Sequence, residues 1–107
     1  MGIICIDTNL LIDYFRKKDK SLTRLVSLAQ RYQIVVPSVV AYEFFRGQNN
    51  TPLDTFLDSF FTQTTSLSFD LGCARKAPEI WQHIKSAGKS IEAEDLLIAA
   101  TAVAWGY

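Results

Sequence analysis

The chain has 107 residues, of which 49% are apolar, and its 11 basic and 11 acidic side chains cancel to a formal net charge of zero. This length and apolar content predict one domain over residues 1–107 with its own core, and the balanced charge gives no bulk preference for a polyanion. No apolar run reaches the roughly 18 residues of a membrane span. The start, Met1-Gly2-Ile3, lacks the charged-then-apolar order of a signal peptide. We therefore expect no membrane contact.

The two cysteines, Cys5 and Cys73, are not arranged as a metal or redox motif. There is no CxxC pair and no Cys/His spacing typical of zinc ligands. We therefore expect two buried free thiols in the reducing cytoplasm and no zinc site.

The first apolar stretch runs from Ile3 to Ile6 without alternation and is rich in β-branched residues. This pattern is typical of a strand buried on both faces of a parallel sheet. Asp7 follows where the strand is expected to give way to a short helix that runs to about Arg16. Its carboxylate would then lie at the carboxyl end of a strand, where ligands bind in open α/β sheets.

Apolar spacing predicts the remaining elements in chain order. Helices are expected over residues 21–32, 38–47, 51–61, 70–88 and 93–105, and strands over residues 34–36 and 64–69. The segment 93–105 is apolar on nearly every side, which predicts a helix buried in the middle of the fold. The alternation of strands with helices favours an α/β fold of three layers, with a central parallel sheet between helices.

Several residues are expected to set the ends of these elements. The expected N-caps are Ser38, Thr51 and Asp70. Pro52 follows a turn at 48–50 and stands at the first helical position. Pro37 is expected to stop the second strand, Gly88 to close the 70–88 helix, and Pro78 to bend or divide that helix.

Three acids interrupt hydrophobic patterns at positions where a core residue would be expected. They are Asp7, Glu43 and Asp95. Carboxylates are rarely buried unless they are paired or bound to a cation, and these three can converge at the carboxyl ends of the strands. Such oxygen ligands suit Mg²⁺ or Mn²⁺. A bound ion of this kind activates water and neutralises charge on a phosphodiester.

Each acid also has a purely structural interpretation. Asp7 can cap the helix that follows it. Glu43 can pair with Arg46, an interaction typically worth a few tenths of a kcal/mol. Asp95 near a helix start interacts favourably with the helix dipole, by roughly 0.3–1 kcal/mol. The sequence offers no competing nucleophile, because His83 is the only histidine and there is no GxxxxGK[ST] loop for a nucleotide.

Taken together, three segments resemble the PIN domain, and especially the VapC-type toxins of bacterial and archaeal toxin–antitoxin pairs. The segments are Ile6–Asp13, Val36–Gly47 and Ala93–Ala102. They occur in the family's order and at its usual separations, and the resemblance spans essentially the whole chain. The resemblance implies a metal-dependent ribonuclease with Asp7, Glu43 and Asp95 at its metal and catalytic positions, supported by Thr8 and Asn9. It also implies Mg²⁺ or Mn²⁺ as cofactor, RNA as substrate, a homodimer and a small antitoxin as partner.

Two features of the C-terminal third depart from the family pattern or leave it ambiguous. Glu94 lies beside Asp95, although Asp95 holds the family's position before Leu-Leu-Ile-Ala-Ala. Family members usually continue after this helix into further strands, so we expect a truncated PIN-like fold with an unpaired edge along Ile3 to Ile6.

Two functions other than a nuclease can be considered for these residues. A truncated PIN-like domain can be catalytically impaired and act only by binding an antitoxin. A haloacid-dehalogenase-type phosphatase needs an acid two residues after the first, where this chain has Asn9. The first of these is the alternative to the nuclease.

The basic residues cluster although the total charge is zero. Arg16, Lys17, Lys18 and Lys20 follow the first predicted helix, and Arg46 stands near Glu43. We expect Arg46, Arg16 and Lys17 to contact RNA phosphates. A solvated turn is the alternative for the lysine cluster.

Overall fold

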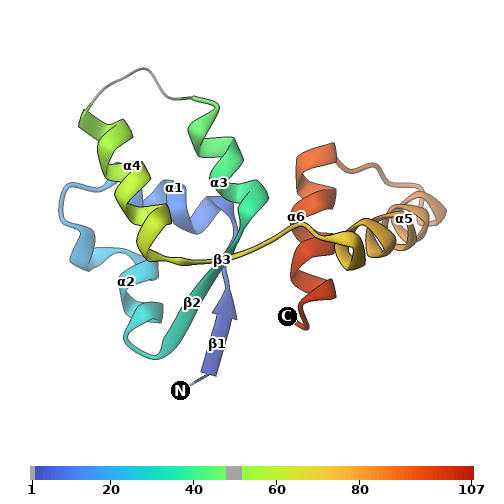
Figure 1. Cartoon of the computed structure of the whole chain (residues 1–107), viewed down its shortest axis with the longest axis horizontal. Coiled ribbons are helices and arrows are strands. Elements are labelled where there is room, and N and C mark those ends of the chain that lie inside the picture. Colours follow the sequence, from blue (N-terminus) through green and yellow to red (C-terminus); the bar gives the residue numbers. More distant parts are fainter. Residues whose placement is uncertain (1, 48–51) are drawn as a thin grey trace.

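The computed structural model describes residues 2–47 and 52–107, with the backbone alone for 52–54. Within these residues a parallel sheet contains β1 (Gly2–Cys5), β2 (Tyr32–Pro37) and β3 (Thr65–Leu67), in the order β1-β2-β3. Helices surround the sheet (Figure 1). They are α1 (Thr8–Arg16), the short 3₁₀ turn η1 (Lys20–Leu22), α2 (Arg24–Ala29), α3 (Ser38–Phe45), α4 (Pro52–Gln63), α5 (Leu71–Ser86) and α6 (Ala93–Ala104). The predicted α/β class is confirmed.

Burial along β2 shows that helices cover both faces of the sheet. Val35 and Val36 are neighbours and therefore point to opposite faces, yet they are only 2% and 0% exposed. Ile34 and Val36 share a face and pack into the main core, which the β1–α1 junction, α2, α3 and α4 also line. The expected layered arrangement of helices around a parallel sheet is therefore present.

Aromatic side chains fix α1, α3 and α4 against one another. The ring of Phe15 on α1 meets those of Phe44, Phe56 and Phe60 edge to face, with centroids 5.2, 5.6 and 5.3 Å apart. Edge-to-face pairs of this kind add to the free energy gained by burying the rings. This packing holds α1 in place, so that its first turn sits at the carboxyl end of β1.

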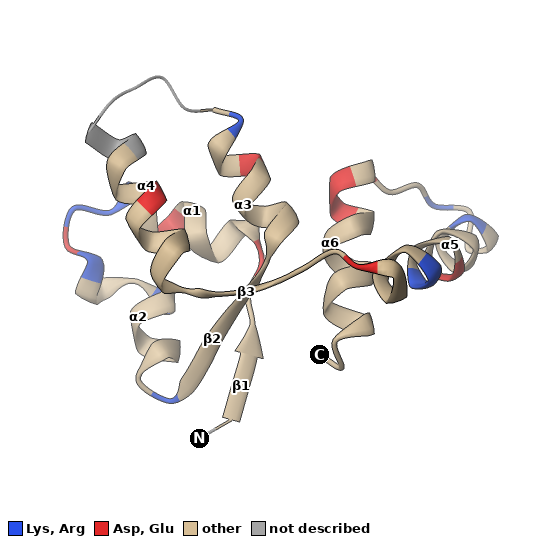
Figure 2. Cartoon of the chain, in the orientation of Figure 1, with Lys and Arg blue, Asp and Glu red and all other residues tan. Residues whose placement is uncertain are grey.

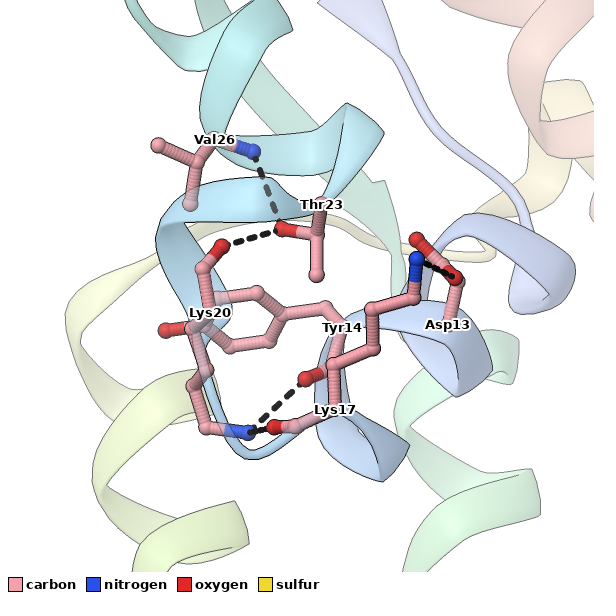
Figure 3. Close-up of polar contacts among 6 residues, drawn as sticks. All are labelled: Asp13, Tyr14, Lys17, Lys20, Thr23 and Val26. Carbon is pink, nitrogen blue, oxygen red and sulfur yellow. Dashed lines mark hydrogen bonds and ion pairs between the residues drawn. The ribbon is translucent and has the colours of Figure 1, made fainter.

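The connection between α1 and α2 is held by Lys20 rather than being a freely solvated turn (Figure 3). The Lys20 ammonium donates to the carbonyl oxygens of Tyr14 at 2.8 Å and Lys17 at 3.3 Å. It also lies 4.7 Å from the centroid of the Tyr14 ring. The Thr23 hydroxyl donates to the Lys20 carbonyl at 2.6 Å and accepts from the amide of Val26 at 3.5 Å. The end of α1 is thereby tied to the start of α2.

The single helix expected over residues 21–32 is wrong. The segment contains η1 and the six-residue α2, separated by Thr23. Thr23 adopts an extended conformation as the N-cap of α2, which interrupts the helix. At the other end, Tyr32 is taken by β2, where it is in register with Gly2. Pairing between strands distant in sequence therefore shortened the helix.

Other boundaries shifted by a few residues. β2 begins two residues before the expected start at Ile34, whereas β3 is shorter than the expected 64–69. Ser38 is not an N-cap, because β2 passes directly into α3 and Pro37 holds the cap position without a side-chain bond. α4 begins at Pro52 as expected, while the turn at 48–50 and the N-cap Thr51 lie outside the described residues.

The predictions for α5 hold at both ends. The Asp70 carboxylate caps the helix by accepting from the amide of Cys73 at 3.1 Å. Gly88 closes it with a positive φ of 75°, which a glycine adopts without strain. Pro78 does not divide the helix, which is continuous across it. Pro78 is exposed, so the carbonyl group that it leaves without an amide partner is near solvent.

α6 is not buried in the middle of the fold as predicted. It packs mainly on α5, and only Ala100 and Thr101 are buried along it. Val103 is 46% exposed, because α6 meets α5 on one side and α3 and β2 on another and so keeps an open face. Among the described helices, none is long and apolar enough to cross a membrane.

The expected open edge of the sheet is present in the described part of the chain. β1 pairs with β2 on one side, and no described strand lies on its other side. The prediction that this strand is buried on both faces is wrong, because Ile3 is 45% exposed at the open edge and no residue of β1 is fully buried. Both cysteines are free, with Cys73 buried and Cys5 only partly so.

Candidate active site

Asp7 lies where β1 passes into α1. Its backbone is extended, and its Oδ1 atom accepts from the amide of Leu10 at 3.3 Å, so it is the N-cap of α1. The side chain is nevertheless exposed, and no hydrogen bond joins its Oδ2 atom to a described residue. The structural interpretation of Asp7 is therefore correct, but capping occupies one of two carboxylate oxygens. The other is available to a ligand.

Asp7 and Asp95 face the same cleft. This cleft has a volume of about 260 Å³ and lies between the start of α1 and the first half of α6. Its lining residues are Asp7, Thr8, Asn9, Asp95, Ile98 and Ala99. The fold thus brings together two of the three acids singled out in the sequence, from opposite ends of the chain. We call this the diacid cleft.

Glu43 reaches the diacid cleft through Thr8. The Thr8 hydroxyl donates to Oε1 of Glu43 at 2.8 Å, which links the first turn of α1 to α3. Glu43 is partly buried and does not itself line the diacid cleft. The alternative in which Glu43 pairs with Arg46 is wrong, because Arg46 has a different partner.

That partner is Glu94. The Nη1 atom of Arg46 lies 3.1 Å from Oε1 of Glu94, and the guanidinium lies 5.3 Å from the Tyr42 ring centroid. Hydrogen bonding with Tyr42, and then with Glu94, raises the pKa of Arg46 above its ordinary value. Glu94 is therefore engaged with α3, while its neighbour Asp95 lines the diacid cleft. Of the two neighbouring acids, Asp95 is the one that lines the diacid cleft, and its catalytic role stays a prediction.

The basic residues proposed for RNA do not line this cleft. Lys17 pairs with Asp13 at 3.6 Å, and Arg16 is exposed at the end of α1. Figure 2 colours basic residues on the segment between α1 and α2 and others on α5, while acidic residues mark the first turn of α6. It stays a prediction that RNA phosphates contact Arg46, Arg16 and Lys17.

A second, larger cleft lies on the other side of Asp7 and has a volume of about 550 Å³. Its lining residues are Cys5, Asp7, Asn9, Leu10, Asp13 and Arg24. Partial burial, and then the charge of Asp7, raise the pKa of the Cys5 thiol. The thiol is thereby kept protonated and is a poor nucleophile. We call this the Arg24 cleft after its basic residue. The sequence pattern gives no reason to single out Arg24.

The diacid cleft fits a small hard cation. Mg²⁺ commonly uses one or two carboxylates and keeps several waters, so Asp7 and Asp95 suffice in kind and number. Within residues 2–47 and 52–107, no three acidic, histidine or cysteine side chains are close enough to share one ion. Glu43 is hydrogen-bonded to Thr8 and not to either acid of the pair, and its direct ligation of a metal stays a prediction.

The profile of the PIN domain matches residues 4–106 of the chain. The chain belongs to the PIN domain family. It is 30% identical over 104 residues to Ribonuclease VapC1 of Methanocaldococcus jannaschii, an alignment that covers 97% of this chain and 71% of the relative. The family resemblance of the three sequence segments is confirmed.

Solved structures of toxin–antitoxin complexes share the fold. VapBC2 from Rickettsia felis, bound to a DNA fragment from its promoter, superposes with a TM-score of 0.76 at 25% identity, covering 96% of this chain and 81% of that one. DNA-bound VapBC from Salmonella typhimurium gives a TM-score of 0.78 at 19% identity, covering 99% and 83%. The PIN fold places both clefts at the carboxyl end of β1, where α/β sheets bind ligands.

Proposed function

We propose that this PIN domain protein is a metal-dependent endoribonuclease and the toxin of a toxin–antitoxin pair. The observation that carries the proposal is the diacid cleft. Asp7 from the β1–α1 junction and Asp95 from α6 both line this cleft. Similarity to a protein named as a ribonuclease supports RNA as the substrate.

Each residue of the site has a chemical part in the proposal. Asp7 and Asp95 would hold Mg²⁺ or Mn²⁺, since both carboxylates line the same cleft. When bound, the ion supplies an activated water and neutralises charge on the phosphodiester. Thr8 donates to Glu43 and so fixes the direction of that carboxylate. Glu43 would bind a second ion or orient the attacking water, and its link to the cleft is the hydrogen bond from Thr8. Asn9 contributes a side-chain amide on the same turn.

The proposal includes an antitoxin protein and a second copy of the chain as partners. Support for the antitoxin comes from the similarity to the VapBC2 structure, which is 25% identical. The free thiols of Cys5 and Cys73 suit a cytoplasmic setting. Light scattering of the purified chain, alone and co-expressed with its neighbouring gene product, measures both associations.

Cleavage of labelled RNA tests the nuclease directly. With Mg²⁺ present, the Asp7→Asn and Asp95→Asn variants should each cleave at least about 100-fold more slowly than the wild type, since each removes several kcal/mol of charge stabilisation. Asp58→Asn is the matched control, because Asp58 is an exposed acid on α4 that lines neither cleft. It should cleave at the wild-type rate.

The same experiment separates the nuclease from a protein that only binds an antitoxin. A wild-type protein that cleaves RNA no faster than its Asp7→Asn variant would rule out the nuclease. Restoration of the Asp95→Asn rate by Mn²⁺ in place of Mg²⁺ would instead place Asp95 at the ion, because the softer ion tolerates an amide ligand better.

A further inference from the structure

Asp7 and Asn9 are shared by the two clefts, and we call this shared wall the ridge. Both residues line the diacid cleft and the Arg24 cleft. The diacid cleft continues toward α6 through Asp95, whereas the Arg24 cleft continues along α1 to Asp13 and across to Arg24 on α2. A flexible polymer held over the ridge would therefore enter both spaces at once.

Arg24 is the cation that faces this ridge. Of the basic residues in the described part of the chain, Arg24 alone lines one of the two clefts. Three other bases have partners elsewhere: Lys17 pairs with Asp13, Arg46 pairs with Glu94, and Lys20 donates to backbone carbonyls. Arg16 and Lys18 are exposed and line neither cleft. Among the described basic residues, the one that lines a cleft at the candidate site therefore lies outside the lysine cluster.

Arg24 has no acidic partner among the described residues. Although Asp7 and Asp13 line the same cleft, neither forms an ion pair with Arg24 within 4.0 Å, and Asp13 is already paired with Lys17 at 3.6 Å. Arg24 is exposed, and its charge is not committed to any described carboxylate. Its planar donor fork is instead free to receive an anion from solution.

We propose that Arg24 binds a phosphate of the RNA strand in the Arg24 cleft, next to the phosphodiester positioned over Asp7 and Asp95. This inference rests on the proposed function, because it takes RNA as the substrate. Arginine suits the role, since two of its N–H groups can meet two phosphate oxygens. A cation is also required there, because Asp7 and Asp13 would otherwise repel the strand. Arg24 is therefore a substrate-positioning residue and not a catalytic one.

Binding of a fluorescein-labelled, single-stranded RNA of 12 nucleotides, measured by anisotropy in EDTA, tests the inference without cleavage. Arg24→Gln should weaken binding roughly fivefold to tenfold, and it should reduce the slope of log Kd against log salt by about 0.7, the value for one lost contact to a single strand. Arg24→Lys should restore that slope, because it restores the charge. Arg75→Gln, an exposed arginine on α5, is the matched control and should bind as the wild type does.

The outcomes separate this inference from the proposed function. If Arg24→Gln binds the RNA with wild-type affinity and salt slope, or if the wild type does not bind it, the role of Arg24 is overturned. If Arg24→Gln weakens binding while wild-type protein with Mg²⁺ cleaves no RNA, the phosphate contact stands and the nuclease proposal fails. A salt slope that Arg24→Lys does not restore would also overturn the inference, because the lost contact would then not be electrostatic.

Discussion

The chain divides into two regions that are stabilised differently. The first, the sheet body, comprises β1 to β3 with α1 to α4, and most of its buried residues form one core from Ile6 to Phe61. The second, the α5–α6 hairpin, buries only small side chains and Cys73 along its helices, and its two tryptophans, Trp81 and Trp105, are 40% and 46% exposed. Figure 1 shows the two helices paired beside the sheet.

This difference matters because the diacid cleft spans both regions. Asp7 belongs to the sheet body and Asp95 to the α5–α6 hairpin. Three contacts hold the hairpin in place: the Arg46–Glu94 pair, the packing of Ile98 against the core, and a hydrogen bond from Trp105 Nε1 to the carbonyl of Ser68 at 2.9 Å. Activity can therefore be lost by moving the hairpin while the sheet body stays folded.

The largest expected effect is on the stability of the sheet body. Phe61 is 6% exposed and contacts the rings of Phe44, Phe45 and Phe60. Phe61→Ala should lower the free energy of unfolding by about 3–5 kcal/mol. Trp81→Ala in the hairpin should lower it by about 1 kcal/mol or less, because that ring is already exposed. Urea denaturation measures both, and equal losses would remove the distinction between the two regions.

The next effect is on activity through docking of the hairpin. Arg46→Gln breaks the ion pair with Glu94, one residue from Asp95, and should reduce RNA cleavage roughly tenfold through misplacement of Asp95. Glu94→Gln should produce the same loss, and the double variant should lose no more than either single one. A loss confined to Arg46→Gln would instead indicate that Arg46 contacts RNA phosphate directly.

A smaller effect is expected from the far end of α6. Trp105→Phe keeps an aromatic ring but removes the hydrogen bond to Ser68, which should cost about 0.5–1.5 kcal/mol. The matched control is Trp81→Phe, since no hydrogen bond from the Trp81 ring to a described residue is present. Hydrogen exchange along α6 should accelerate in the first variant alone. Unchanged exchange would show that Ser68 does not anchor the helix.

The smallest effect is the pH dependence of the α5 cap. Hydrogen bonds from Cys73, chiefly from its backbone amide, lower the pKa of Asp70 below its ordinary value. A group whose folded-state pKa is lowered stabilises the fold above its unfolded pKa, and the contribution is lost as pH falls through the folded value. The unfolding temperature of the wild type should therefore drop relative to that of Asp70→Asn below about pH 4. Parallel pH profiles for the two proteins would contradict this.

Local patterns predicted the elements that local chemistry controls. The apolar run before Asp7 gave β1 and the start of α1, and Asp70 and Gly88 marked the ends of α5. The length of α2 was misjudged, because pairing of Tyr32 with Gly2 across the sheet overrides helical spacing. Apolar periodicity also cannot say how many partners a helix has, which is why α6 was expected to be buried.

The candidate site was only partly accessible from sequence. Asp7 and Asp95 stood out because each breaks an apolar pattern, and the fold brings them to one cleft. The bond from Thr8 to Glu43 joins residues far apart in the chain and leaves no trace in spacing. Arg24 is exposed at the start of a short helix, where an arginine is unremarkable, and only the packing of α2 beside α1 brings it near Asp7.

The central claim is that Asp7 and Asp95, contributed by different regions, hold one divalent ion. Calorimetric titration with Mn²⁺ tests it most directly and needs no RNA. The wild type and the Asp58→Asn control should bind Mn²⁺ equally, and Asp7→Asn and Asp95→Asn should each weaken binding by more than about tenfold, a loss of at least about 1.4 kcal/mol. Wild-type affinity in the Asp95→Asn variant would contradict the claim, because the ion would then be held without the α5–α6 hairpin.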